Sequence, residues 1–565
     1  MTATHPDIPA AAATGTSAAT ESITAGELTA RFLEAAGVDT VFGVISIHNM
    51  PILDAIAQRG RIRFVAARSE QGAANMADAN ARVRGGLGVV ISSTGTAAGN
   101  TCGSMVEAFT AGTPLLHITG QIERPWLDRG WGYIHEARDQ LAMMSAVSKR
   151  AYRVWSADAT LGILREASRT ALSSPSGPVA VEIPIDVQQS TLACPRELAP
   201  LPIASLPVDE ASLDRLAEAL SRARRPLLWL GGGARAAERE VAALVALGFG
   251  VVTSVQGRGI IDERHPMSLG AYNLYPEVEQ FYGRCDAMLV VGSQLRSNET
   301  LRYALKLPRP LYRIDADASR DARSYPSDGF VTGDAALTLA GLASRLRGRM
   351  QIDPAFAADL ATTRGAATAR IEAMLGPYRG LVDALNRASA ARPCLWVRDV
   401  TVSNSTWGNR AVMLRGPREG VHAMGGGIGM GIQMALGAAL AAPERKTLCL
   451  SGDGGLMVNV GELATLVQEK ADVTLFVMND RGYGVIRNIQ DAQYGGRRHY
   501  VDLHTPQFET FAAALGLGYR RISRSDEFDT VVGEAISQRG PLLVEVDMTA
   551  IGPYASAFAG PPLKP

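Results

Sequence analysis

The chain has 565 residues, of which 47% are hydrophobic and 20% charged, and its 56 basic and 56 acidic side chains give a formal net charge of zero. A chain of this length is expected to form about three or four domains of roughly 150 residues each. The balanced charge excludes the basic footprint of a protein that binds nucleic acid or anionic membranes, so a small-molecule function is the better expectation.

The cysteines and the N-terminus favour a cytoplasmic protein. The five cysteines occur singly and without CxxC spacing, which argues against a disulfide framework or a structural zinc site. Residues 1–22 are rich in Ala and Thr and contain no Lys or Arg, so they lack the features of a signal peptide and are expected to form a disordered tail. No stretch approaches about 18 uninterrupted apolar residues, so no membrane span is expected.

From residue 23 onward, short runs of Val, Ile and Leu alternate with longer segments of helical spacing, which is the rhythm of βαβ units with a parallel sheet. Breaks in this pattern, one of them rich in Pro and Ala, divide it into three doubly wound α/β domains of similar size. We expect these domains at residues 23–190, 205–350 and 380–550, followed by a C-terminal tail at 551–565.

Two acidic side chains follow buried strands of the third domain. Asp453 lies in the stretch "LCLSGDGG", between Gly452 and the pair Gly454 and Gly455, and Asp480 follows "VTLFVMN" 27 positions later. Consecutive βαβ strands usually lie side by side, so both carboxylates are expected at one edge of the sheet. Two hard oxygen ligands suit Mg²⁺ or Ca²⁺, and Mg²⁺ usually keeps positions for phosphate and water. The glycines let a phosphate approach the backbone at the start of the next helix.

A Gly-Asp-Gly followed one strand later by Asn-Asp resembles the signature of thiamine-diphosphate-dependent enzymes of the pyruvate decarboxylase, acetolactate synthase and benzaldehyde lyase group. The likeness covers residues 23–550, in the order of pyrimidine-binding, central and diphosphate-binding domains. It implies thiamine diphosphate with Mg²⁺, for which Ca²⁺ or Mn²⁺ can substitute. The implied metal ligands are Asp453, Asp480 and the carbonyl of Gly482, with Tyr483 next to the cofactor. Asp480 stands where Asn is more usual in the family, which adds a negative charge but keeps an oxygen ligand.

Glu70 opens a predicted helix, "EQGAANMADANAR", whose small residues permit close packing. The plain interpretation is an acidic first-turn residue stabilised by the helix dipole. The resemblance instead implies the family's catalytic glutamate, which hydrogen-bonds N1′ of the aminopyrimidine and promotes the tautomer that deprotonates C2 of the thiazolium. In "HAMGGGIGMG", it implies that Ile428 supports the bent cofactor and that the carbonyl of Gly426 accepts from its 4′-amino group.

The resemblance also implies a homodimer or homotetramer. The family's cofactor lies between the pyrimidine-binding domain of one subunit and the diphosphate-binding domain of another. Glu70 and Asp453 would then meet across a subunit interface. The tail at 551–565 is expected either to fray or to act as a lid over the active-site mouth.

Two histidines are candidates for the substrate side of the site. His48 follows the first strand, and His135 stands where acetolactate synthases and benzaldehyde lyase have Gln. A histidine near neutrality can relay a proton or polarise a carbonyl, although each could equally be an ordinary polar loop residue. The adjacent His-His pair of pyruvate decarboxylases is absent. The stretch "VVGSQLRSNETL" lacks the Phe-Asp-Asp-Arg pattern common in FAD-binding acetolactate synthases, which argues against FAD.

The sequence therefore predicts a lyase or transferase of acetolactate-synthase type that acts on 2-oxo acids or 2-hydroxy ketones through a C2-enamine, by decarboxylation and carboligation. Three alternatives stay open: an acyloin (benzoin-type) lyase, an acyl-CoA lyase or decarboxylase relative with an ADP moiety in its central domain, and a non-catalytic cofactor-binding relative. The expected partners are a small-molecule substrate and further copies of the chain, without nucleic acid or membrane.

Overall fold

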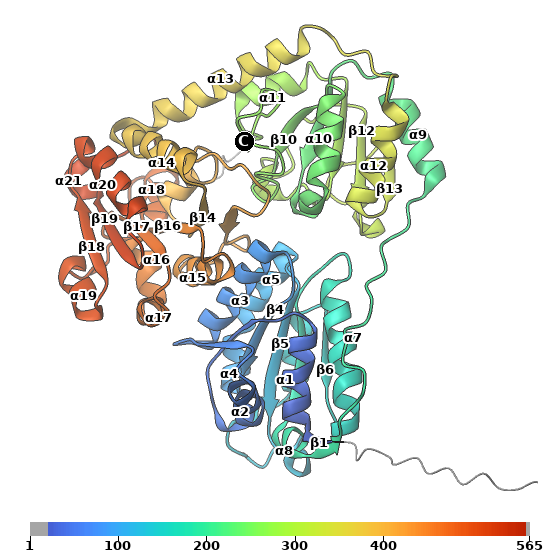
Figure 1. The fold of residues 1–565 in the computed structure, drawn as a ribbon. Helices are drawn as coiled ribbons and strands as arrows, with labels where there is room; N and C mark the ends of the chain where they lie inside the picture. The colour runs from blue at the N-terminus through green and yellow to red at the C-terminus, as the bar shows by residue number, and fades with distance from the viewer. Residues whose placement is uncertain (1–20, 561–565) are drawn as a thin grey trace, which may run out of the picture.

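The computed structural model describes residues 21–560 and contains three parallel sheets flanked by helices (Figure 1). The predicted fold class, three α/β domains with parallel sheets, is confirmed. No helix within residues 21–560 is long and apolar enough to cross a membrane.

The first domain is built on a six-stranded sheet whose strands are short runs of mostly apolar residues. The strands are β2 (Thr40–Gly43), β3 (Arg63–Ala66), β4 (Gly88–Ser92), β5 (Leu115–Gln121), β6 (Arg150–Arg153) and β7 (Val179–Pro184). The helices are α1 (Ala25–Ala35), α2 (Met50–Arg59), α3 (Glu70–Arg84), α4 (Thr96–Asn100), α5 (Cys102–Ala111), α6 (Gln140–Ala146), α7 (Thr160–Leu172) and α8 (Ile185–Gln189). The strand order is β3-β2-β4-β5-β7-β6.

The predicted disordered tail at residues 1–22 is wrong for its last two residues, Glu21 and Ser22. Residues 1–20 lie outside the described part of the chain, but β1 (Ser22–Thr24) pairs antiparallel with β8 (Thr191–Ala193). Glu21 is also ordered, since its carboxylate accepts a hydrogen bond of 2.6 Å from the Arg31 guanidinium. The strand pairing satisfies backbone groups and fixes the start of α1 against the end of the domain.

The central domain has a five-stranded sheet in the order β10-β9-β11-β12-β13. Its strands are β9 (Pro226–Leu230), β10 (Gly250–Thr253), β11 (Ala287–Val291), β12 (Leu311–Asp315) and β13 (Gly329–Thr332). Its helices are α9 (Glu210–Leu220), α10 (Glu238–Ala246), α11 (Pro276–Tyr282) and α12 (Ala335–Leu346). The long helix α13 (Phe356–Leu375), followed by α14 (Arg379–Ala391), leads from this domain to the third (Figure 1).

The third domain has a six-stranded sheet in the order β15-β14-β16-β17-β19-β18. Its strands are β14 (Cys394–Arg398), β15 (Gly420–His422), β16 (Lys446–Gly452), β17 (Val473–Asn479), β18 (Gly518–Ile522) and β19 (Leu542–Asp547). Its helices are α15 (Gly431–Ala441), α16 (Asp453–Val458), α17 (Glu462–Gln468), α18 (Gly484–Gln493), α19 (Phe508–Leu515), α20 (Phe528–Ser537) and α21 (Met548–Ile551). Two short helices, α16 and α17, connect β16 to β17. At the break between them, the Asn459 side chain donates to the carbonyl of Gly429 at 2.9 Å.

The first and third sheets share one topology. Numbered within each domain, both have the strand order 2-1-3-4-6-5. In each domain the helix after the second strand, α3 or α15, packs against its counterpart in the other domain (Figure 1). The approach is close, because a Cβ added at Gly437 would lie 2.1 Å from the carbonyl oxygen of Met76. The Asn75 side chain also donates to the Gln433 carbonyl oxygen at 2.5 Å. Small buried residues therefore join the two domains into one body.

Candidate active site

The two acidic residues of the third domain meet at one edge of the sheet. β16 and β17 are adjacent and parallel, and Asp453 and Asp480 immediately follow their carboxyl ends. Asp453 is fully buried, and within residues 21–560 neither of its carboxylate oxygens has a hydrogen-bond partner. Burial raises the pKa of Asp453 well above its usual range, and the neighbouring Asp480 carboxylate raises it further. Burial also raises the pKa of Asp480, which the Arg487 guanidinium 3.6 Å away opposes.

This arrangement fits a divalent cation. A buried carboxylate without a partner is unfavourable unless a cation neutralises it, and two carboxylates supply the hard oxygens that Mg²⁺ or Ca²⁺ takes. Among the described residues there is no cluster of three or more His, Cys, Asp or Glu side chains that could hold a metal. Gly482 lies in the turn after Asp480, where it forms an antiparallel bridge with Asp502. An added Cβ at Gly484 would lie 1.9 Å from the Asp480 carboxylate.

The glycines around Asp453 keep the backbone close to its neighbours. An added Cβ would lie 3.0 Å from the Tyr483 ring at Gly454, 2.9 Å from the Asp399 carboxylate at Gly455, and 3.0 Å from a hydroxyl at Gly452. Side chains at these positions would collide with these neighbours, so glycine is what lets the backbone pack this closely around the acid pair.

Sequence reasoning missed Asp399, which follows β14 just as Asp453 and Asp480 follow the two next strands of the sheet. Its carboxylate is buried and accepts hydrogen bonds from the backbone N–H groups of Val400 at 2.7 Å and Gly429 at 3.0 Å. Burial raises the pKa of Asp399 to about 6. The signal that could have found it is the acid directly after the apolar run "CLWVR".

The segment before α15 presents Gly426 and Ile428. Gly426 has φ +82, a conformation that favours glycine, and an added Cβ there would meet nothing within 4 Å. Ile428 is 36% exposed although it is a large aliphatic residue. An open carbonyl and an exposed apolar side chain next to each other suit a ligand with a polar edge and an apolar face.

Glu70 is the first residue of α3, as the sequence predicts. The helix is capped by Ser69, whose hydroxyl accepts from the backbone N–H of Gly72 at 2.9 Å. The Glu70 carboxylate is half-buried and accepts from the Asn100 side chain through Oε2 at 3.0 Å. Its Oε1 accepts no hydrogen bond within residues 21–560, so one oxygen remains for a ligand.

The structure brings the two candidate histidines together from loops 87 positions apart. The His48 and His135 rings are in edge contact, with centroids 5.4 Å apart. Burial lowers the pKa of His48, the charge of His135 lowers it further, and Glu123 opposes the shift. Two glycines, Gly120 and Gly95, let the backbones of His48 and His135 approach closely. Added Cβ atoms would lie 2.2 Å from the His48 carbonyl at Gly120 and 2.1 Å from the His135 carbonyl at Gly95.

The first- and third-domain groups do not meet directly within one chain. In the described part of the chain, no hydrogen bond or ion pair joins Glu70, His48 or His135 to Asp453 or Asp480.

The described part of the C-terminal tail packs beside the helix that follows Asp480. The Tyr554 hydroxyl accepts from Trp407 at 2.8 Å and donates to Ser403 at 2.7 Å. Asn488 of α18 donates to the carbonyl of Phe558 at 3.2 Å. Residues 561–565 of the predicted lid lie outside the described range.

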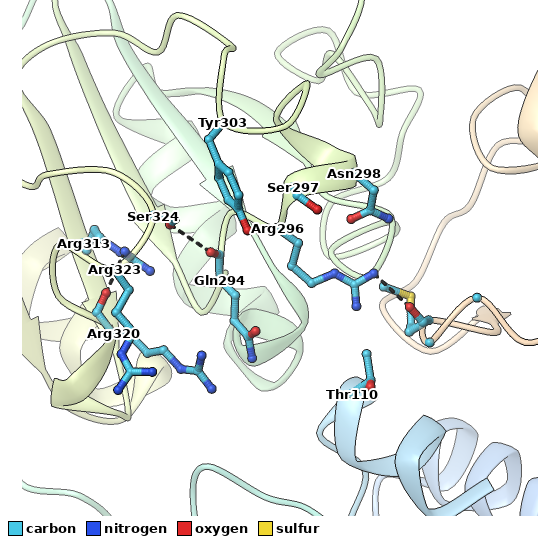
Figure 2. A pocket seen from close by; sticks show the side chains of 13 residues that line it. Thr110, Gln294, Arg296, Ser297, Asn298, Tyr303, Arg313, Arg320, Arg323 and Ser324 are labelled. Carbon is cyan, nitrogen blue, oxygen red and sulfur yellow. Dashed lines mark hydrogen bonds between the residues drawn. The ribbon is translucent and has the colours of Figure 1, made fainter. Parts of the chain in front are cut away.

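A cavity of about 590 Å³ lies between the central domain, α5 and residues 424–426 (Figure 2). Its lining includes four arginines, Arg296, Arg313, Arg320 and Arg323. In the described part of the chain only Arg320 among them has an ion-pair partner, Asp317. The cavity therefore suits an anionic ligand.

Comparisons with known proteins place the chain in a family. Three thiamine pyrophosphate enzyme profiles match: the N-terminal TPP binding domain at residues 23–143, the central domain at 213–342, and the C-terminal TPP binding domain at 401–546. The chain is 33% identical over 535 residues to the probable 2-ketoarginine decarboxylase AruI of Pseudomonas aeruginosa, covering 93% of this chain and 94% of that protein.

Acetolactate synthases are also similar. Identity to the isozyme 1 large subunit of Escherichia coli is 28% over 550 residues, covering 95% of this chain and 96% of that protein. Identity to the acetolactate synthase of Arthrospira platensis is 27% over 548 residues, covering 91% of this chain and 92% of that protein. The chain therefore belongs to the family of thiamine-diphosphate-dependent enzymes, among lyases and transferases of the decarboxylase and acetolactate synthase type.

Proposed function

We propose that this enzyme uses thiamine diphosphate and Mg²⁺ to break or form the carbon–carbon bond next to the carbonyl of a 2-oxo acid or 2-hydroxy ketone. The observation that carries the proposal is the unpartnered buried carboxylate of Asp453 beside Asp480, in a chain that also presents Glu70 at the start of α3. The similarity to acetolactate synthases and to a probable 2-ketoarginine decarboxylase supports decarboxylation of a 2-oxo acid, followed by carboligation, as the leading reaction.

The third domain would hold the diphosphate end of the cofactor. Asp453, Asp480 and the carbonyl of Gly482 would bind Mg²⁺, and the backbone N–H groups of Gly454 and Gly455, at the start of α16, would face the phosphates. The unpartnered oxygens of Asp453 support this assignment, because a cation would neutralise two buried like charges.

The reactive end would be held by residues of both domains. The carbonyl of Gly426 would accept from the 4′-amino group, Ile428 would lie against the thiazolium, and Glu70 would share a proton with N1′ of the pyrimidine. Bound thiamine diphosphate supplies a nucleophilic carbon that adds to a carbonyl group. The bond from Asn100 orients the Glu70 carboxylate and leaves its second oxygen for that proton.

His48 and His135 would serve the substrate. The lowered pKa of His48 keeps its ring neutral near pH 7, so that it can accept a proton or donate a hydrogen bond to a substrate oxygen. His135 is exposed and its ring is in edge contact with that of His48, so the two side chains would face the same substrate. The C-terminal tail would cover the substrate and limit its size.

A homodimer or homotetramer would complete the site. Within residues 21–560 no hydrogen bond joins Glu70 to the acid pair of its own chain, and we propose that it acts beside Asp453 of a second copy. The exposed apolar side chains of Ile47, Trp131 and Ile134, at 66%, 67% and 70% exposure, lie around the two histidines in sequence and are available to such an interface.

The acyloin lyase and the non-catalytic relative differ from the leading proposal in the chemistry they require. An acyloin lyase would use the same residues and cleave a hydroxy ketone without loss of CO₂. A non-catalytic relative would have no need of Glu70, whose capped position and free oxygen speak against that alternative.

The arginine-lined cavity favours one second candidate, an acyl-CoA lyase or decarboxylase relative that binds an ADP moiety in its central domain. If that alternative is right, ADP or coenzyme A raises the thermal midpoint of the protein, and Arg323→Gln, which removes an arginine without an ion-pair partner in the described chain, reduces the shift. Differential scanning fluorimetry measures both. The absence of a shift at millimolar ADP contradicts this candidate.

The leading reaction is tested by product analysis. We expect the protein reconstituted with Mg²⁺ and thiamine diphosphate to release CO₂ from at least one 2-oxo acid in a panel containing pyruvate and 2-ketoarginine, with products followed by NMR. Formation of acetolactate from pyruvate would identify carboligation. Cleavage of benzoin together with inertness toward every 2-oxo acid would instead establish the acyloin lyase.

Glu70→Gln tests the catalytic glutamate. Because the amide cannot share a proton with N1′ as a carboxylate does, turnover should fall by at least about 100-fold. The stabilisation of the protein by Mg²⁺ and thiamine diphosphate in a thermal-shift assay should remain, since the acid pair is intact. Full activity in this variant would refute the assigned role.

Asp453→Ala and Asp480→Asn test the metal site as a matched pair. Removing Asp453 deletes a ligand and should weaken Mg²⁺-dependent cofactor binding by about 100-fold or more in isothermal titration calorimetry. Asp480→Asn keeps an oxygen ligand, so binding should stay within about 10-fold. Relief of the buried like charge should raise the thermal midpoint of metal-free Asp480→Asn above that of the parent. Equal losses in both variants would contradict the ligand assignment.

A further inference from the structure

Two buried carboxylates lie at the interface between the first and third domains, outside the site described above. Glu107 is on α5 and Glu462 is the first residue of α17, and each side chain is 1% exposed. Neither acid contacts Asp453 or Asp480 in the described chain. Burying a carboxylate is unfavourable unless hydrogen bonds satisfy it, so their partners show what these residues do.

Glu107 of the first domain binds backbone of the third domain. Its Oε1 accepts from the N–H of Met424 at 2.6 Å and its Oε2 from the N–H of Gly425 at 2.5 Å. The same carboxylate pairs with Arg82, which donates from another nitrogen to the carbonyl of His422 at 2.7 Å. The first domain thereby fixes residues 422–425, which directly precede Gly426.

Glu462 of the third domain binds backbone of the first domain. Its carboxylate accepts from the N–H of Arg68 at 3.1 Å and from the N–H of Ser69 at 3.0 Å. It also accepts from the Ser69 hydroxyl at 3.0 Å and from Thr465 at 2.7 Å. The third domain thereby fixes the two residues that directly precede Glu70.

The two interactions are related by the shared topology. In each domain the carboxylate comes from the second helix after the third strand, α5 after β4 and α17 after β16. In each case it binds the backbone that leads into the helix after the second strand of the other domain, α15 or α3. The same device therefore occurs twice across one pseudo-twofold interface.

Glycines show how tightly each carboxylate is held. An added Cβ at Gly72 would lie 2.1 Å from Oε1 of Glu462, and one at Gly425 would lie 2.9 Å from Oε2 of Glu107. Either carboxylate would have to move if its glycine carried a side chain.

Residues 426–428, the segment proposed to face the cofactor, are held at both ends by carboxylates. Glu107 binds residues 424 and 425, and Asp399 of the third domain binds the N–H of Gly429. Residues 426–428 therefore span two carboxylate anchors, one from each domain. Such fixed anchors hold a carbonyl and an apolar side chain at set positions before any ligand binds.

We propose that Glu107 and Glu462 are reciprocal positioning residues: each domain uses one buried carboxylate to fix the cofactor-facing segment of the other. Glu107 sets the position of Gly426 and Ile428, and Glu462 sets the direction of Glu70. The roles of Gly426, Ile428 and Glu70 rest on the proposed function, but the backbone ordering itself does not depend on it.

Amide hydrogen exchange of the full-length protein without cofactor or metal tests the ordering directly. In Glu462→Gln, one acceptor oxygen becomes an NH₂ group that faces N–H donors, and exchange at residues 68 and 69 should become about 10-fold faster or more. In Glu107→Gln the same increase should appear at residues 424 and 425. Each variant should leave the other segment unchanged. Unaltered exchange at the assigned segment overturns the proposal.

Glu469→Gln is the matched control. Glu469 directly follows α17 and pairs across the same domain interface, but with the half-exposed side chain of Arg63 rather than with backbone. Its loss removes the same charge and should leave exchange at both segments unchanged. An equal increase in this control would mean that the interface as a whole has loosened, which also overturns the proposal.

Two glycine variants provide the same test if a glutamine variant does not fold. Gly72→Ala displaces Glu462 and Gly425→Ala displaces Glu107 without removing a charge, so each should reproduce the exchange increase of the corresponding glutamine variant. A folded Gly72→Ala protein with unchanged exchange at residues 68 and 69 counts against the assignment.

Cofactor measurements separate the two roles. Glu107→Gln should raise the Kd for thiamine diphosphate in the presence of Mg²⁺ by about 10-fold, because the segment that meets the pyrimidine is loosened. Glu462→Gln should leave this Kd within about 2-fold of the parent and lower kcat, because only the glutamate is misdirected. Reversed effects refute the assigned roles. Because hydrogen exchange is measured without cofactor, a failure of the proposed reaction would leave that result standing.

Discussion

The packing of α3 against α15 is the constraint on which the rest of the site depends. The two helices approach until Gly437 touches the carbonyl of Met76, and the alanines along α3 are fully buried. No side chain larger than these fits without separating the helices. Because each helix begins at the carboxyl edge of its own sheet, their contact also sets the distance between the two edges that carry the chemistry.

The site concentrates groups that are unfavourable in the metal-free protein. Asp453 is buried without a partner beside another acid, and His48 is buried with a lowered pKa. The surrounding structure supports these groups through extensive apolar cores, and a ligand that binds only the folded state would recover part of the cost. Buried polar groups without hydrogen-bond partners therefore occur where function is expected. At Glu107 and Glu462, in contrast, backbone N–H groups donate to the buried carboxylates.

The sequence predicts much of this arrangement because its strongest signals are local. Buried strands such as β16 and β17 are continuous apolar runs, and an acid directly after each run must lie at the sheet edge. Glu70 could be placed because a helix start has a local signature in Ser69. The short strands β3 and β6 carry charged residues and gave no comparable signal.

Other parts of the site could not be predicted because they depend on contacts between distant segments. Glu107 and Glu462 bind backbone N–H groups, and because almost every residue has one, the sequence does not reveal these partners. The contact of His48 with His135 joins the short 3-10 helix Ile47–Asn49 to an irregular loop, and only the folded chain brings these two segments together. At the break between α16 and α17, Asn459 likewise binds a distant segment, at the carbonyl of Gly429.

The second acid of the pair, Asp480, has a consequence for how the proposed enzyme assembles. A metal-free site with two carboxylates repels a diphosphate, and this repulsion is strong where water is excluded. In the proposed enzyme the cation would therefore enter before the cofactor or together with it, and a site with Asn in place of Asp480 would impose this order less strictly. The fraction of protein with bound cofactor would then depend more steeply on the free Mg²⁺ concentration than on the concentration of thiamine diphosphate, so Mg²⁺ would control how much of the enzyme is active.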